Sequence, residues 1–163
     1  MDRTIVYIDM DNTLVDFQSG IDSLSPAEKS QYGPSEKHPA GNYDDFSGIF
    51  SKMKPLPGAI DAFHWMADHF DTYILSTAPW DNPSAWCDKL EWVKKHLGES
   101  AKKRLILSHH KNLLMGDYLI DDSAKNGAGE FKGQHLKFGT DYITKQPNEF
   151  PDWNSILRYF KKL

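Results

Sequence analysis

The sequence predicts an α/β fold in which a parallel β-sheet lies between layers of helices. Short runs of β-branched and aromatic residues alternate along the chain with longer stretches of helical spacing. Such alternation is typical of parallel strands joined by right-handed helical crossovers. Polar residues follow several of the strand-like runs directly, and the carboxyl ends of parallel strands are where such sheets bind their ligands.

Five strands are predicted from short apolar runs that end in polar residues. The first run, residues 4–9, is too short for a helix and is rich in β-branched residues, which is typical of a buried strand. The other strands are expected at residues 72–76, 104–108, 118–120 and, more weakly, 135–138.

Helices are predicted where apolar residues between these runs recur at helical spacing. One is expected from Pro57 to Phe70, and another from Pro83 to a stop at Gly98. Proline favours the first helical position, and glycine favours the position after the last. A final helix is expected after Asp152, whose carboxylate can cap a helix N-terminus.

Residues 18–54 interrupt this pattern and are interpreted as a small, mainly helical cap inserted after the first strand. The catalytic core would then comprise residues 1–17 and 55–163. Glycine and proline recur through the insertion, so no long helix is expected there. Short helical pieces are predicted at residues 25–31, where Ser25 can cap and Pro26 can open the helix, and at residues 43–53.

Length and composition fit one globular domain of 163 residues. Lysine and arginine number 19 against 23 acidic residues, a net charge of −4, so no overall basic field favours a nucleic-acid duplex. The opening residues reach two aspartates after only a few apolar positions, which excludes a signal peptide or a membrane span there. A cytoplasmic location is therefore expected, with no membrane partner.

Asp9 and Asp11 stand two positions apart where the first strand passes into a turn, so both carboxylates can reach one pocket. A carboxylate that attacks phosphorus needs cationic groups nearby to overcome repulsion from the phosphate. Asp9 is the candidate nucleophile. Asp11 is the candidate general acid and base, which would protonate the leaving oxygen and later deprotonate water.

A second pair of acids, Asp121 and Asp122, ends the predicted strand at 118–120. Together with Asp9 and Asp11 they predict an oxygen-rich metal site, which suits Mg²⁺ because that ion prefers hard oxygen ligands. Zinc would require histidine or cysteine ligands at suitable spacing.

Phosphate binding is predicted at Lys111, a compact cation, and at Ser76 and Thr77, which end the second strand. Each feature taken alone has an ordinary structural explanation, such as a turn, a helix cap or a solvated surface lysine. Their joint order along the chain favours the functional interpretation.

In this order, the motifs resemble those of the haloacid dehalogenase superfamily of phosphatases. The first motif of that superfamily is DxDx[TV], and the others are a serine or threonine ending a strand, a lysine, and paired acids after a later strand. The matching residues are Asp9, Asp11, Thr13, Ser76, Lys111, Asp121 and Asp122.

The resemblance implies a three-layer Rossmann-like core and an enzyme that forms an aspartyl-phosphate at Asp9. It also implies that Mg²⁺ is held by Asp9, the Asp11 carbonyl and Asp122, while Asp121 supports these groups or adds a ligand. An aspartate at position 11 disfavours dehalogenases and transport ATPases, which carry other residues there.

A narrower resemblance is to the 5'(3')-deoxyribonucleotidases of the cytosolic and mitochondrial type. It rests on DMDNTLVDF against the family's DMDGVLxDF, on KPLPGA after the insertion, and on the spacing K-x9-DD. Phe17 falls where those enzymes place a phenylalanine against the nucleobase, and Tyr43 and Phe46 are further candidates for the base pocket. Asn12 and Thr13 depart from the family's Gly-Val.

Three functions remain open from the sequence. The first is a nucleoside monophosphate phosphatase, the second a phosphatase for sugar or other small metabolite phosphates, and the third a non-catalytic binding module for phosphate ligands. A homodimer is an open alternative to a monomer.

Overall fold

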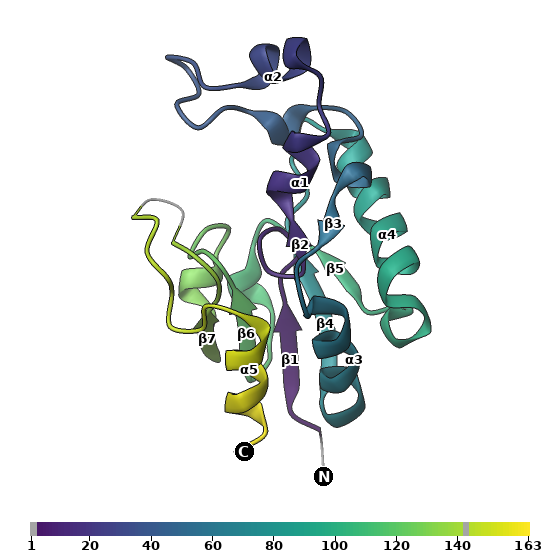
Figure 1. Ribbon diagram of the computed structural model, residues 1–163. Helices are drawn as coiled ribbons and strands as arrows, with labels where there is room; N and C mark the ends of the chain where they lie inside the picture. Colours follow the sequence, from purple (N-terminus) through teal and green to yellow (C-terminus); the bar gives the residue numbers. More distant parts are fainter. Residues whose placement is uncertain (1–2, 142–143) are drawn as a thin grey trace.

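The computed structural model describes residues 3–141 and 144–163, and a five-stranded sheet forms its centre (Figure 1). The strand order is β5-β4-β1-β6-β7, and all neighbouring strands are parallel. The strands are β1 (Ile5–Ile8), β4 (Asp71–Ser76), β5 (Leu105–Leu107), β6 (Tyr118–Asp121) and β7 (Gln134–Lys137). The predicted α/β fold with a parallel sheet is confirmed, and β1 lies at the centre of the sheet.

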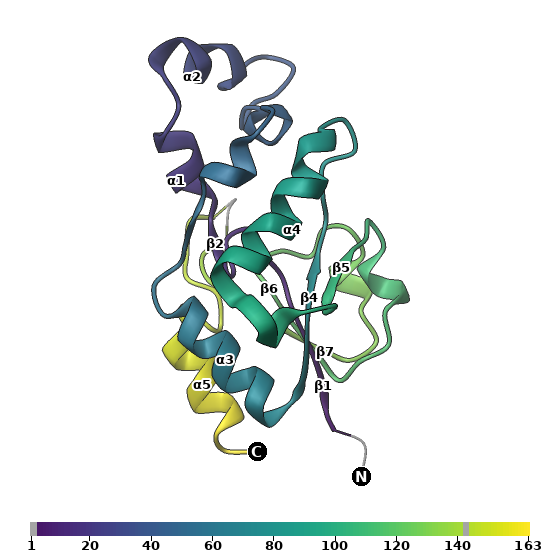
Figure 2. The same ribbon diagram turned by 90° about the vertical axis from the view of Figure 1, so that its right-hand side faces the viewer.

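The two faces of the sheet bury different side chains, because successive strand residues point to opposite faces. Val6 and Ile8 pack into the larger core cluster, together with the long helices that cover one face (Figure 2). These helices are α3 (Ala59–His69), α4 (Pro83–Leu97) and α5 (Trp153–Phe160). Tyr7 points to the other face, where Phe131 and the short 3-10 helix η5 (Ala128–Glu130) pack against it. The connections before and after β6 are too short for a long α-helix, so this second layer is thinner than the sequence predicted.

The ends of the long helices follow from local sequence. α4 begins at Pro83 as predicted, and Gly98 ends it with a φ of 63° before the 3-10 helix η3 (Gly98–Ala101). Asp152 caps α5 through a hydrogen bond from the backbone N–H of Ser155, 2.7 Å long. α3 begins two residues later than predicted, because Gly58 adopts a left-handed φ of 76° that helical geometry excludes.

An inserted segment, residues 17–53, lies over the carboxyl ends of the strands and forms the top of the molecule in Figure 1. It leaves and rejoins the core through a two-stranded antiparallel sheet, in which Val15 pairs with Pro55 and Asp16 with Lys54. The elements in and around it are β2 (Val15–Asp16), α1 (Phe17–Asp22), α2 (Pro26–Tyr32), η1 (Tyr43–Asp45), η2 (Ile49–Lys52) and β3 (Lys54–Pro55).

The inserted segment is helical where the sequence predicted it, with two differences. Ser25 forms a capping box with Glu28 at the start of α2, as expected. Helix α1 was not predicted, and Asp16 caps it by accepting a hydrogen bond from the Ser19 backbone. The piece expected at residues 43–53 is divided into η1 and η2, because Gly48 has a left-handed φ of 84°.

Among the residues described, no helix combines the length and the apolar character that a membrane span requires. The largest helices instead carry one buried stripe each, which packs on the sheet.

Candidate active site

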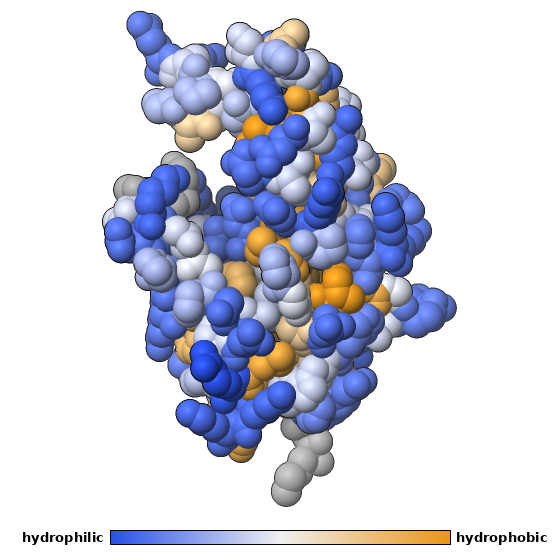
Figure 3. Space-filling model, viewed as in Figure 1, coloured by the Kyte–Doolittle hydropathy of each residue, from blue (hydrophilic) through white to orange (hydrophobic). Residues whose placement is uncertain are grey.

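A cavity of about 600 Å³ lies between the carboxyl ends of the strands and the inserted segment. Figure 3 shows the corresponding hollow, below the lobe at the top of the view. Most predicted site residues line it, and Ser76 and Phe46 do not. The predicted residues that line the cavity are Asp9, Asp11, Phe17, Tyr43, Thr77, Lys111, Asp121 and Asp122.

The turn after β1 aims Asp9 and Asp11 into this cavity. The Asp9 backbone N–H donates to the Ile120 carbonyl at 2.9 Å, which extends the pairing of β1 with β6. The carbonyl of Met10 then accepts hydrogen bonds from three successive N–H groups, beginning with Thr13. Asn12 has a left-handed φ of 58°, a conformation that asparagine tolerates better than most residues. The departure of Asn12 from the family's glycine therefore preserves the turn.

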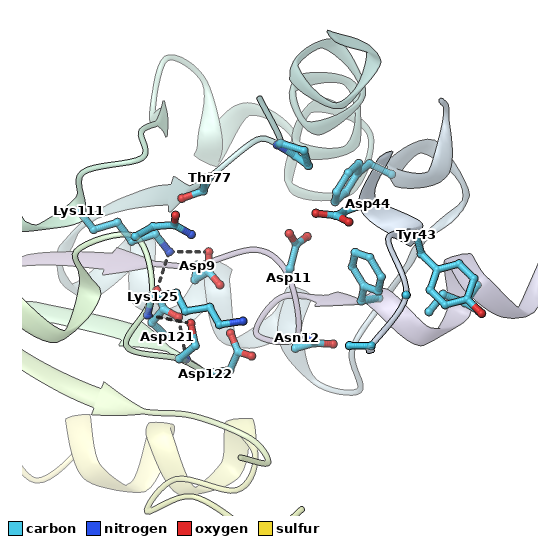
Figure 4. A pocket seen from close by; sticks show the side chains of 18 of the residues that line it. Asp9, Asp11, Asn12, Tyr43, Asp44, Thr77, Lys111, Asp121, Asp122 and Lys125 are labelled. Carbon is cyan, nitrogen blue, oxygen red and sulfur yellow. Dashed lines mark hydrogen bonds and ion pairs between the residues drawn. The ribbon is translucent and has the colours of Figure 1, made fainter. Parts of the chain in front are cut away.

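Lys111 connects two of the predicted acids. It opens the 3-10 helix η4 (Lys111–Leu113), and its ammonium donates to Asp9 Oδ1 at 2.9 Å and to Asp121 Oδ2 at 2.5 Å (Figure 4). Only 3% of Lys111 is exposed. Burial alone would lower the pKa of this lysine, but the charges of Asp9 and Asp121 outweigh burial and raise its pKa above the ordinary value. Lys111 is therefore a fixed positive charge beside the candidate nucleophile.

Asp9, Asp121 and Asp122 form an acidic cluster whose carboxylate oxygens lie within 4.8 Å of one another. Burial and the charge of Asp9 raise the pKa of Asp121 to about 7 and that of Asp122 to about 8. Both oxygens of Asp121 have protein donors, Lys111 and the Ser123 backbone. Asp122 has no such donor in the described part of the chain, so its carboxylate is the better placed of the two to bind a cation.

Asp11 is held by a residue that the sequence analysis missed. Lys89 on α4 is fully buried, and its ammonium donates to Asp11 Oδ2 at 2.9 Å. The Asp11 side chain keeps 28% exposure, because it faces the cavity. Burial raises the pKa of Asp11 and Lys89 opposes that shift, while the charge of Asp9 raises the pKa further. The pKa of Asp11 is therefore raised overall. A raised pKa is the direction that favours a carboxyl group as a general acid near neutral pH.

Helical spacing in the sequence could have predicted that Lys89 is buried. The buried stripe of α4 runs through Ala85, Lys89, Trp92, Val93 and Leu97. Trp86 and Leu90 also follow helical spacing with Val93 and Leu97, but Leu90 is 42% exposed. A stripe shifted by one position would have put a lysine between alanine and tryptophan on the buried face, which is unusual for that residue type.

The end of β4 corrects the prediction for Ser76. Ser76 is fully buried, and its hydroxyl accepts a hydrogen bond from Lys89 Nζ at 3.0 Å, so it lies behind the cavity wall. Side chains alternate along a strand, and the next residue, Thr77, therefore faces the cavity. The Thr77 hydroxyl donates to the Ser108 carbonyl at 2.7 Å. Of the two residues predicted to bind phosphate at this strand end, Thr77 lines the cavity and Ser76 does not.

The aromatic residues predicted to hold a base are divided between the cavity and the interior of the inserted segment. Phe17 lines the cavity and packs edge to face on Phe50, with ring centroids 5.9 Å apart. Tyr43 also lines it, although its hydroxyl points away from Asp9 (Figure 4). The prediction for Phe46 is wrong as a direct contact, because its ring packs on Tyr32 at 5.2 Å, outside the cavity lining.

The inserted segment also contributes Asp44, whose carboxylate faces the cavity. The backbone of η1 is held to the core by Asn82, which is 2% exposed. The Asn82 amide donates to the carbonyls of Asp44 at 2.7 Å and Phe46 at 3.1 Å. Burial followed by the charge of Asp45 raises the pKa of Asp44. The two hydrogen bonds from Asn82 hold η1, and with it this part of the inserted segment, against the core.

A family model described as "5' nucleotidase, deoxy (Pyrimidine), cytosolic type C protein" matches residues 22–150. The chain belongs to this family. A protein of Vibrio phage KVP40, named as a candidate 5'(3')-deoxyribonucleotidase, is 61% identical over 158 residues, which cover 97% of this chain and 85% of that protein. The human 5'(3')-deoxyribonucleotidase of cytosolic type is 31% identical over 139 residues, or 72% of this chain and 69% of the human protein.

Solved structures with low sequence identity share the fold of this type C nucleotidase family member. YfnB from Bacillus subtilis, a magnesium-bound candidate hydrolase of the haloacid dehalogenase type, has a TM-score of 0.65 at 13% identity, and the match covers 98% of this chain and 99% of that chain. The L-2-haloacid dehalogenase of Xanthobacter autotrophicus has a TM-score of 0.60 at 13% identity, covering 100% of both chains. The fold expected from the superfamily resemblance is confirmed. The family match confirms the prediction of a phosphoric monoester hydrolase.

Proposed function

We propose that this chain is a magnesium-dependent nucleotidase that hydrolyses deoxyribonucleoside monophosphates through a phosphorylated Asp9. The observation that carries the proposal is the environment of Asp9, a carboxylate at a cavity wall that is paired with Lys111 and adjacent to two further acids. The names of the phage and human relatives support the substrate class. We further propose that residues 18–54 act as a cap over a core of residues 1–17 and 55–163.

The acidic cluster fits a magnesium ion. Its donors are all carboxylate oxygens, a ligand set that suits this ion, and burial followed by the charge of Asp9 raises the pKa values of Asp121 and Asp122. Asp9, Asp122 and the Asp11 carbonyl would hold the ion, and Asp121 would keep Lys111 in place. When bound, magnesium offsets the charge of the phosphate and so lowers its repulsion for the nucleophile.

The protein residues divide the chemistry among them. A carboxylate oxygen of Asp9 bonds to phosphorus while the ester bond to the leaving oxygen breaks, and Asp11 donates a proton to that oxygen. Asp11 then takes a proton from the water that releases phosphate from Asp9. Lys111 offsets charge on the phosphoryl oxygens. The Thr77 hydroxyl can join it only by turning away from the Ser108 carbonyl.

The aromatic wall favours a nucleotide over a sugar phosphate. Phe17 and Phe50 line the cavity on the side of the inserted segment, and an aromatic ring contributes about 1–3 kcal/mol per stacked base. Sugar or other small metabolite phosphates stay a second candidate substrate class because Asp44 lines the cavity. Its carboxylate can accept hydrogen bonds from the hydroxyl groups of a sugar. The cytoplasmic location stays a prediction, as does the choice between monomer and homodimer.

The test is phosphate release from deoxyribonucleotides, ribonucleotides and sugar phosphates at millimolar magnesium. We expect deoxyribonucleotides to give the highest kcat/KM, and a preference for sugar phosphates over every nucleotide would overturn the assigned substrate. Asp9→Asn should abolish turnover, whereas Asp61→Asn makes the same change at an exposed position of α3 and should not. Undiminished turnover in Asp9→Asn would remove the covalent mechanism, and an inactive wild-type protein would favour the non-catalytic binding module.

A further inference from the structure

Lys89 is a lysine with no exposed surface, in the middle of the helix that covers the sheet. Burial of an ammonium is costly, because the interior does not replace the water that solvates the charge. Ion pairs of this kind add little to stability, and apolar residues of similar volume often serve a core as well. The buried stripe of α4 is otherwise formed by alanine, tryptophan, valine and leucine. A role in packing alone therefore does not explain a lysine at this position.

The Lys89 ammonium has three partners, two through hydrogen bonds and one through a cation–π contact. One hydrogen bond goes to Asp11 Oδ2 at 2.9 Å and another to the Ser76 hydroxyl at 3.0 Å. The ammonium also lies 4.4 Å from the ring centroid of Phe50, a cation–π distance. The three partners come from the turn after β1, the end of β4 and the inserted segment. Ser76 and α4 therefore fix the ammonium independently of the carboxylate that it binds.

The hydrogen bond from Lys89 restricts how the Asp11 carboxylate can turn. Lys89 holds Oδ2, whereas Oδ1 is buried and has no hydrogen-bond partner among the described residues. With Oδ2 held by Lys89 and Oδ1 enclosed by the protein, the orientation in which the Asp11 carboxylate faces the cavity is set. Lys89 is absent from the cavity lining, so it acts through Asp11 rather than on the phosphate.

We propose that Lys89 is a positioning residue that orients Asp11 for proton transfer and links it, through the Phe50 ring, to the aromatic wall of the cavity. The link follows from the position of Phe50, whose ring contacts both the Lys89 ammonium and the Phe17 ring. This inference rests on the proposed function, in which Asp11 is the general acid and base.

The test compares Lys89→Met, which keeps an unbranched side chain without the charge, with Lys95→Met, the same change at an exposed position of the same helix. With a deoxyribonucleotide, Lys89→Met should lower kcat by about 100-fold or more, the range of general acid and base catalysis, while KM changes little. Lys95→Met should match the wild type. In a crystal structure of Lys89→Met, the Asp11 carboxylate should leave its wild-type orientation.

p-Nitrophenyl phosphate provides a readout that a structural role would not change. Its leaving group needs no proton, so Lys89→Met should still transfer the phosphoryl group to Asp9. Release of phosphate from Asp9 needs the base and should be slow, which predicts a burst of p-nitrophenol close to the enzyme concentration. In an Asp11→Asn background, adding Lys89→Met should reduce the rate little further.

The outcomes separate the two proposals. If the wild type turns over, Asp11→Asn is impaired and Lys89→Met is as fast as the wild type, the role of Lys89 is overturned and the proposed function stands. Turnover in Asp9→Asn would instead overturn the proposed function. If Lys89→Met does not fold, Ser76→Ala removes one of the two hydrogen bonds of the ammonium at small volume cost. It should give a smaller burst and a smaller loss of kcat, and wild-type behaviour would overturn the proposal.

Discussion

The acidic cluster should make the stability of the metal-free protein fall as pH rises. Burial and mutual repulsion raise the pKa of Asp121 to about 7 and that of Asp122 to about 8 in the folded chain. In the unfolded chain, an aspartate titrates near 3.9. Between about pH 4 and pH 8, the folded chain therefore binds protons that the unfolded chain does not, and the free energy of unfolding decreases with rising pH.

The size of the effect follows from the same pKa values. Between pH 6 and pH 8, ionisation of the two carboxyl groups should lower the free energy of unfolding by about 2–4 kcal/mol, which is an order-of-magnitude figure because the two groups interact. Magnesium binds the ionised cluster of the folded state only, so it should restore the stability at pH 8.

Urea unfolding followed by tryptophan fluorescence measures this, since the chain contains five tryptophans. It should be run at pH 6 and pH 8, with chelator and with magnesium. His96 and His135 act in the opposite direction, because burial lowers the pKa of each. Asp122→Asn retains both histidines and is the matched control, with a weaker fall in stability between the two pH values. A metal-free wild type with the same pH dependence as Asp122→Asn would refute the reasoning.

Three further substitutions test other contacts. Phe17→Leu should raise KM for deoxyribonucleotides several-fold and leave KM for a sugar phosphate unchanged, because only the nucleotide has an aromatic ring to stack; equal effects in the kinetic assay would contradict this. Asn82→Ala deprives two carbonyls of η1 and the following turn of their donor, and it should cost about 1–3 kcal/mol in urea unfolding and raise KM. Lys111→Met leaves buried acids unpaired, and it should abolish turnover and cost about 3–5 kcal/mol in metal-free protein, against no loss in Lys95→Met.

The sheet and its catalytic edge were predictable because both depend on local signals. Each strand is a short apolar run, and acidic residues stand at the ends of β1 and β6. Parallel strands place these ends at the same edge of the sheet. Asp9, Asp11 and Asp122 therefore line the cavity that the sequence predicted. The strand end at Ser76 was harder to interpret, since a one-residue shift decides which side chain faces the ligand.

The inserted segment was less predictable because long-range contacts decide its details. Nothing local marks Phe46 as interior and Phe50 as part of the cavity wall; the difference arises where η1 is held by Asn82, which lies far along the chain. The pairing of Lys89 with Asp11 spans 78 positions. A periodic pattern can show that a lysine is buried, but it cannot show which acid it meets.

The two-stranded sheet at the base of the inserted segment has a consequence for how such enzymes diversify. The chain departs at Asp16 and returns at Lys54, and these two residues are paired neighbours. Because the two ends of the inserted segment are held together, segments of different length can be inserted between them without moving β1 or the carboxylates that follow it. Exchange of residues 17–53 with those of a relative should transfer substrate preference as a module, provided that the replacement supplies an aromatic ring to meet Lys89.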